Sequence, residues 1–132
     1  MTLPATSWVA DLAGVRPLPA SRFTWYGDTT ALAVVLPVDG VYRVSPSEPP
    51  FGVKVAWWRY LSGTVEITAR RVDGTTPEIK TMTIEGYGGN GFNPSEIRFT
   101  SEGCWRVQGL LQGRKLTFVM LVRRVAPGES AP

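Results

Sequence analysis

Short apolar segments alternate along the chain with turns rich in glycine and proline. In residues 65–70 (VEITAR) apolar and polar side chains alternate strictly, which is typical of a strand with one buried face. Residues 31–36 (ALAVVL) form a continuous apolar run, which predicts a strand covered on both faces. No segment shows the 3.6-residue period of an amphipathic helix. The pattern therefore predicts an all-β fold.

The turn signals divide the chain into roughly eight or nine short strands. The predicted strands are residues 22–26, 31–36, 41–44, 53–60, 65–70, 79–84, 97–99, 104–110 and 115–124. Residues 45–50 are predicted to be a loop because their three prolines cannot donate to a ladder, and residues 86–94 are predicted to be a glycine-rich loop. Gln112-Gly113 closes a hairpin between the last two strands. This spacing favours an antiparallel β-sandwich, with a β-barrel such as an OB-fold as the alternative.

The chain of 132 residues is the size of one domain. Residues 1–20 hold three prolines and no sustained alternation, so we expect an extended N-terminal arm there. The sandwich is expected over residues 21–126, and a short flexible tail over residues 127–132.

The segment Gly103-Cys104-Trp105-Arg106-Val107 resembles the corner before the penultimate strand of immunoglobulin-like domains. The resemblance implies an immunoglobulin-like antiparallel sandwich of about 7–9 strands with Trp105 and Val107 facing its core. Because the corner aromatic is a tryptophan, any corner hydrogen bond must come from its indole N–H. No inter-sheet disulfide can form, because Val107 stands where antibody domains place a cysteine. Trp57 similarly resembles the buried tryptophan of the third strand of such folds.

A wider resemblance covers most of the chain. It rests on the segments Trp25 to Asp28, Leu32 to Gly40, Lys54 to Arg59, Arg70 to Asp73, and Gly86 to Trp105. These segments are similar to a set of uncharacterised bacterial secreted or lipoprotein-like proteins for which no activity is established. The resemblance implies an extracellular or cell-envelope protein. We expect any membrane attachment to come only through a leader or lipid anchor that is not part of the sequence given.

The charge pattern argues against nucleic-acid binding. The net charge is +3, with 14 basic and 11 acidic residues. The arginines are scattered rather than gathered in a stripe that would replace counterions along phosphates. The longest apolar run, residues 31–38, is interrupted by Pro37 and is far shorter than the ~20 residues that a membrane helix needs.

The residue inventory excludes several kinds of chemistry. With no histidine and one cysteine, the chain cannot form a Ser-His-Asp triad, a histidine-containing zinc site or an internal disulfide. Gly86, Gly88 and Gly91 fit a G-x-G-x-x-G pattern, but Pro94 follows where a dinucleotide site needs a helix. We therefore assign no catalytic residue, cofactor or metal. Cys104 is expected on the non-core side of its strand, as a free thiol, an intermolecular disulfide or a small packed side chain.

Aromatic side chains supply the candidate binding residues. Trp57 and Trp58 are adjacent, so one faces the core and the other faces away; we predict that Trp58 and Tyr60 lie outside. Three interpretations stay open for them, namely cover by the arm, contact with a partner, or a platform for carbohydrate. Tyr87, Asn90 and Phe92 at the tip of the glycine-rich loop are further candidates for a ligand site.

The last predicted strand has a second apolar face, because Val119 and Leu121 alternate with the inward Phe118, Met120 and Val122. We therefore expect the arm or a partner chain to cover it. The favoured function is a non-catalytic envelope or extracellular module that mediates protein–protein interaction or self-assembly. The alternative is a module that binds carbohydrate or a small ligand through the outer aromatics or the Gly86–Gly91 loop.

Overall fold

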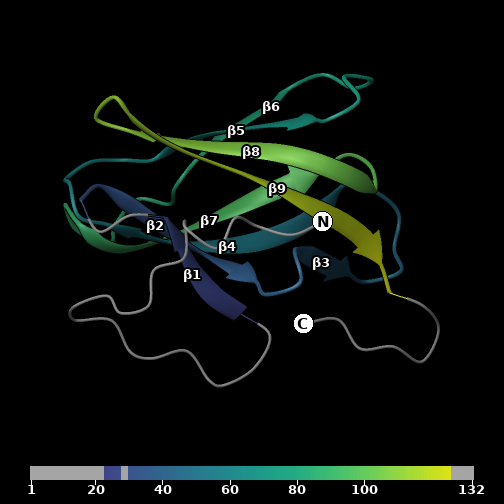
Figure 1. Cartoon of the computed structure of the whole chain (residues 1–132), viewed down its shortest axis with the longest axis horizontal. Helices are drawn as coiled ribbons and strands as arrows, with labels where there is room; N and C mark the ends of the chain where they lie inside the picture. Colours follow the sequence, from purple (N-terminus) through teal and green to yellow (C-terminus); the bar gives the residue numbers. More distant parts are fainter. Residues whose placement is uncertain (1–22, 28–29, 126–132) are drawn as a thin grey trace.

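The structure is a computed structural model that describes residues 23–27 and 30–125 (Figure 1). The predicted arm and tail lie outside these residues, so the expected domain limits stay predictions. The described chain forms nine strands and no helix. The strands are β1 (Phe23–Gly27), β2 (Leu32–Pro37), β3 (Val41–Val44), β4 (Phe51–Arg59), β5 (Glu66–Arg71), β6 (Ile79–Met82), β7 (Gly91–Phe99), β8 (Gly103–Leu111) and β9 (Arg114–Arg124).

The strands form two sheets that pack face to face. One sheet has the order β1-β2-β4-β7 and the other has the order β3-β9-β8-β5-β6. The fold is thus the predicted immunoglobulin-like β-sandwich and not a closed barrel. One pairing differs from the antiparallel expectation, because β3 runs parallel to β9. This arises because the chain crosses from one sheet to the other between β2 and β3, which leaves β3 beside the last strand.

Strand β7 begins well before the predicted segment 97–99. Pro94, which was expected to lie in a loop, is the middle of this strand and pairs with Ala56 of β4. β7 is the edge of its sheet, and Pro94 lacks only an N–H on the side away from β4. The carbonyl O of Pro94 faces that side and accepts a bond from the N–H of Ile84 at 2.9 Å. A proline therefore costs the ladder nothing at this position.

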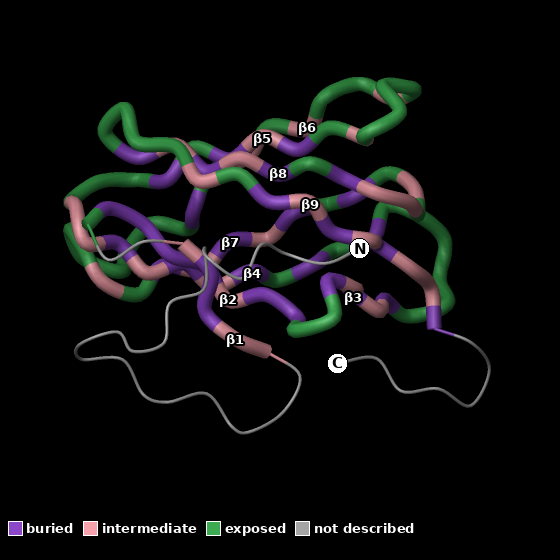
Figure 2. Tube along the Cα trace, viewed as in Figure 1, coloured by how far each residue is buried: buried purple, intermediate pink, exposed green. Residues whose placement is uncertain are grey.

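The inner faces of the two sheets form one continuous apolar core, and buried and exposed positions alternate along the central strands (Figure 2). Trp57 of β4 is fully buried and its ring centroid lies 6.0 Å from that of Phe118 on β9. Its Nε1 donates to Oγ of Ser95 at 2.8 Å, so the buried indole is satisfied. Trp57 is buried as predicted, but its likeness to the tryptophan of the third immunoglobulin strand is wrong. That strand lies beside the penultimate strand of the domain, and here β5, not β4, pairs with the penultimate strand β8.

The corner before β8 places Trp105 in the core. Trp105 is fully buried, and its Nε1 donates to the carbonyl O of Ser101 at 3.0 Å. The expected hydrogen bond from the indole N–H is therefore present. Outside the corner, the guanidinium of Arg71 donates to Oγ of Ser101 at 2.8 Å and to the carbonyl O of Glu102. The corner is held from both sides.

The second apolar face of β9 points away from the core. Val119 and Leu121 are half-buried there, while Phe118, Met120 and Val122 are buried in the sandwich. Cys104 is a free, half-buried cysteine that lies beside Leu121 in the ladder. The alternation was predicted correctly, but cover of this face by the arm or by another chain stays a prediction.

A glycine on β8 makes room for the largest core side chain. A methyl group added at Gly109 would lie 2.7 Å from Cζ3 and 2.9 Å from Cη2 of Trp57, which reaches it from the opposite sheet. We expect Gly109→Ala to lower the free energy of unfolding by about 2 kcal/mol, because the buried ring has no space to move. Urea unfolding measures this loss. Gly89→Ala is the matched control, since its methyl group would come no closer than 3.7 Å to Oγ of Ser62. Equal stability of the two variants would contradict the close packing of Trp57 on Gly109.

Candidate functional site

The fold brings four of the five predicted binding residues together at one end of β4 and β7. Trp58 of β4 and Phe92 of β7 are directly opposite in the ladder. The ring of Tyr87 packs edge-to-face on Phe92, with centroids 5.7 Å apart and planes at 72°. Tyr60 follows the last residue of β4 and packs in the same apolar cluster as Trp58. We call Trp58, Tyr60, Tyr87 and Phe92 the aromatic surface.

The aromatic surface has an anchored half and an exposed half. Trp58 and Tyr60 are half-buried and pack against a small cluster that contains Trp25, Ala33 and Val35. This cluster is separate from the main core and lies on the other face of the four-stranded sheet. Tyr87 and Phe92, by contrast, are 46% and 45% exposed. The predicted outward orientation of Trp58 is confirmed. Whether the N-terminal arm covers Trp58 and Tyr60 lies outside the described residues.

The loop that carries Tyr87 and Asn90 is organised by a buried arginine. Arg59, the last residue of β4, is 4% exposed. Its Nη2 donates to the carbonyl O atoms of Tyr87, Gly88 and Asn90, each at 3.1 Å. Its Nε donates to the carbonyl O of Gly91 at 3.2 Å. A single side chain thus binds four carbonyls of residues 87–91.

The same arginine joins this loop to the turn after β4. Nη1 of Arg59 donates to the carbonyl O of Gly63 at 2.6 Å, and the N–H of Gly63 donates to the carbonyl O of Gly89 at 2.8 Å. Burial lowers the pKa of Arg59 from its usual value, because the charged form loses water. The carbonyl dipoles replace that water, and no carboxylate takes part in these bonds. The site is therefore a rigid loop held from below by a buried charge.

Arg59 was not among the site residues predicted from the sequence. The alternation that placed Val55 and Trp57 inward also places Arg59 inward, which is an unusual position for an arginine. An inward arginine at the end of a strand, in a chain that also has a glycine-rich loop, is a signal for backbone carbonyl contacts. Its partners in the glycine-rich loop were not readable from the sequence, because they lie 28 to 32 residues further on.

The glycines of the loop have the conformational role that was expected. Gly86, Gly88 and Gly91 have φ angles of 97°, 79° and 80°, which L side chains rarely adopt. The loop leads into strand β7 and not into a helix, so the G-x-G-x-x-G pattern has no helix N-terminus to hold a pyrophosphate. Asn90 is exposed at the loop, and its backbone carbonyl is one of the acceptors for Arg59.

Residues 23–27 and 30–125 contain no group of three or more His, Cys, Asp or Glu residues that could hold a metal ion. They also contain no helix long and apolar enough to cross a membrane. Comparison of the chain with protein-family models, with curated proteins and with solved structures gave no match.

Proposed function

We propose that the chain is a non-catalytic β-sandwich module of the bacterial envelope or exterior that binds a protein partner through the aromatic surface. The observation that carries the proposal is the pair Tyr87 and Phe92, two nearly half-exposed rings packed on each other beside Trp58. Aromatic side chains that fill a partner's pockets dominate the binding energy of many interfaces. The envelope location follows from the resemblance to secreted and lipoprotein-like proteins.

The loop under this pair supports a binding role. An exposed glycine-rich loop would lose much conformational freedom when a partner orders it. Here Arg59 already fixes the loop through carbonyls of Tyr87, Gly88 and Asn90. The aromatic rings are thus presented in a defined arrangement before binding, which reduces the entropic cost of association. The absence of histidine removes the commonest general base, which favours binding over catalysis.

The test compares the wild-type chain with the double variant Tyr87→Ser/Phe92→Ser. We expect the double variant to weaken binding to the partner captured from an envelope fraction by at least roughly tenfold, as for interface hot spots. Biolayer interferometry with the purified partner measures the dissociation constant. Val72→Ser is the matched control, since Val72 is 49% exposed, outside the aromatic surface, and its change should leave the constant unaltered.

Two further measurements separate the alternatives. Sedimentation equilibrium shows whether the partner is a second copy of the chain, in which case the double variant shifts the equilibrium towards monomer. A glycan panel read by tryptophan fluorescence tests the carbohydrate alternative, with Trp58→Ala as the variant that should abolish the signal. If neither the double variant nor Trp58→Ala alters any binding that the wild-type chain shows, the aromatic surface is not the binding site.

A further inference from the structure

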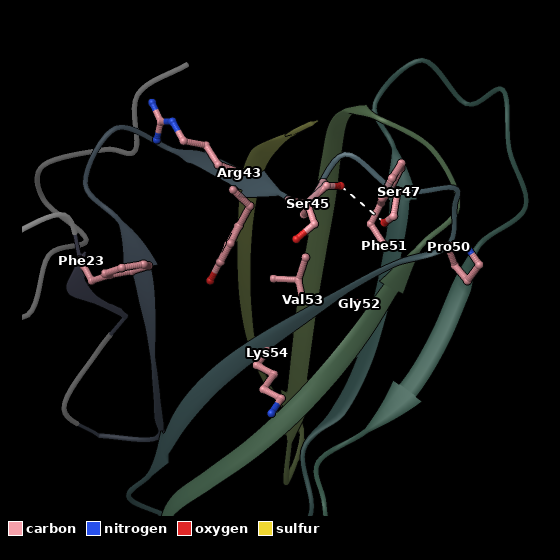
Figure 3. Close-up of a pocket in the computed structure, with 11 residues that line it drawn as sticks. Phe23, Arg43, Ser45, Ser47, Pro50, Phe51, Gly52, Val53 and Lys54 are labelled. Carbon is pink, nitrogen blue, oxygen red and sulfur yellow. Dashed lines mark hydrogen bonds between the residues drawn. The ribbon is translucent and has the colours of Figure 1, made fainter. Parts of the chain in front are cut away.

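A cavity of about 430 Å³ opens on the flank of the sandwich, between β3 and the first half of β4 (Figure 3). Phe23, Tyr42 and Val53 are among its apolar lining residues, and Ser45 and Lys54 are among its polar ones. Figure 3 shows Phe23, Ser45 and Val53 around the same space, with Lys54 at its lower end. A volume of this order is usual for a ligand site, so the opening is large enough to hold side chains of another molecule.

The cavity exists because β2 leaves β4 early. The β1–β2 ladder runs to Pro37, but the β2–β4 ladder ends at the pair Val34 and Trp57. Beyond that point the hydroxyl of Tyr42 on β3 donates to the carbonyl O of Val35 at 3.2 Å. The end of β2 thus turns towards β3, and among the described residues the first half of β4 pairs with a strand on one side only, which is β7.

The backbone of β4 therefore has hydrogen-bonding groups at this cavity that no described strand pairs with. The N–H of Tyr60 donates to the carbonyl O of Ala31 on the β2 side at 2.8 Å. In an antiparallel ladder every second residue directs both its N–H and its C=O to the same neighbour. Lys54 and Gly52 have the same parity as Tyr60, so their backbone groups also face the β2 side. Within the described chain no strand lies there, and both residues line the cavity.

We propose that this groove binds an extended peptide segment of another protein, which adds to β4 as a short strand beside Gly52 and Lys54. Strand addition to a free sheet edge gains main-chain hydrogen bonds, and the alternate side chains of the added segment enter pockets. The added segment takes the position that β2 vacates. This interaction goes beyond the proposed function, because the aromatic surface lies at the opposite end of β4.

The lining of the groove defines the chemistry of the segment. The residue opposite Lys54 lies on the same face of the sheet as the Lys54 side chain, where a carboxylate would meet an ammonium group. Lys54 is exposed and forms no ion pair among the described residues. Its ladder partner Glu96 instead pairs with Arg98, whose Nε lies 3.1 Å from Oε1 of Glu96. The residues before and after the acidic one point the other way, into the apolar space beside Val53 and Tyr42. The groove thus fits an apolar-acidic-apolar segment.

Amide hydrogen exchange on the full chain tests the position of the added strand. The probe is the capped pentapeptide threonine-valine-glutamate-valine-threonine. At saturation we expect exchange of the Gly52 and Lys54 amides to slow by at least about tenfold, because both donate to the peptide. A peptide with proline in place of glutamate should bind far more weakly.

Binding without protection of these two amides would overturn the proposal, as would no binding at millimolar peptide. Strong protection of both amides in the free chain would also overturn the proposal, because the groove would already be occupied. Protection that rises with protein concentration would identify the occupant as a second copy, and protection independent of concentration would identify it as a segment of the same chain.

A charge exchange tests the role of Lys54. In Lys54→Glu we expect the dissociation constant for the glutamate peptide to rise about fivefold, and that for the corresponding lysine peptide to fall by a similar factor. Lys80→Glu makes the same change in net charge on the edge strand β6, so both constants should stay as in the wild type. Equal effects of the two substitutions would show that only net charge matters and would overturn the predicted pairing. The outcome is independent of the Tyr87 and Phe92 variants, so each proposal can fail alone.

Discussion

Arg59→Met should lower the free energy of unfolding by about 3 kcal/mol and release the loop that carries Tyr87. Arg59 binds the carbonyls of Gly63, Tyr87, Gly88, Asn90 and Gly91 and is 4% exposed. Methionine fills a similar volume but donates no hydrogen bond, so these carbonyls must find water. The loop can do this only by moving outwards. Urea unfolding measures the global loss, and exchange of the Gly63 amide, which donates to Gly89, reports the release of the loop.

Two variants show whether the bond pattern or the charge is responsible. Arg59→Lys keeps the charge but has three donors on one nitrogen, so it should recover only part of the stability. Arg98→Met removes an arginine that is 71% exposed and bonded to Glu96, and a surface pair of this kind should cost less than about 0.5 kcal/mol. If Arg59→Met is as stable as Arg98→Met, the loop is held by other contacts.

The same substitution links the fold to the proposed function. In Arg59→Met the rings of Tyr87 and Phe92 remain in the sequence, but their loop is no longer fixed. Binding through a preorganised surface should then weaken even though no contacting side chain has changed. The arrangement of the aromatic surface therefore depends on a buried residue that is not part of it.

Local pattern was sufficient for much of the fold. The alternation in residues 65–70 became β5, the hairpin at Gln112-Gly113 joins β8 and β9, and Trp105 faces the core as expected. These features depend on neighbours within a few residues, whose periodicity the sequence displays directly. The outward position of Trp58 was also predictable, because Trp57 next to it takes the inward position.

Features that depend on distant partners were not predictable. The parallel pairing of β3 with β9 joins residues about eighty positions apart, and no local pattern reports it. Pro94 was expected to lie in a loop, yet it lies within β7, where its missing N–H faces the outer edge of the sheet. Likewise, the groove beside Gly52 and Lys54 follows from the point at which β2 leaves β4. Alternation in the sequence predicts which side chains of a strand share a face, but which strand pairs with each of its edges depends on the whole sheet.

Trp105→Ala should lower the free energy of unfolding by about 4 kcal/mol. The indole is fully buried, its centroid lies 5.2 Å from that of Phe99 on the opposite sheet, and its Nε1 donates to Ser101. Alanine removes the ring from between the sheets and leaves the carbonyl of Ser101 without this donor. Both losses fall at the corner that starts β8, which pairs with β5 and β9. Urea unfolding monitored by circular dichroism measures the effect.

Trp105→Phe separates the two contributions, because it keeps an aromatic ring against Phe99 but removes the N–H. We expect a loss of about 2 kcal/mol, of which roughly half comes from the hydrogen bond and the rest from the smaller ring. Arg106→Ala, at the next and exposed position, should cost less than about 0.5 kcal/mol. If Trp105→Phe is as damaging as Trp105→Ala, the bond to Ser101 holds the corner and the ring does not. If neither substitution lowers stability, Trp105 does not join the two sheets, and the corner depends instead on the contacts of Arg71 with Ser101 and Glu102.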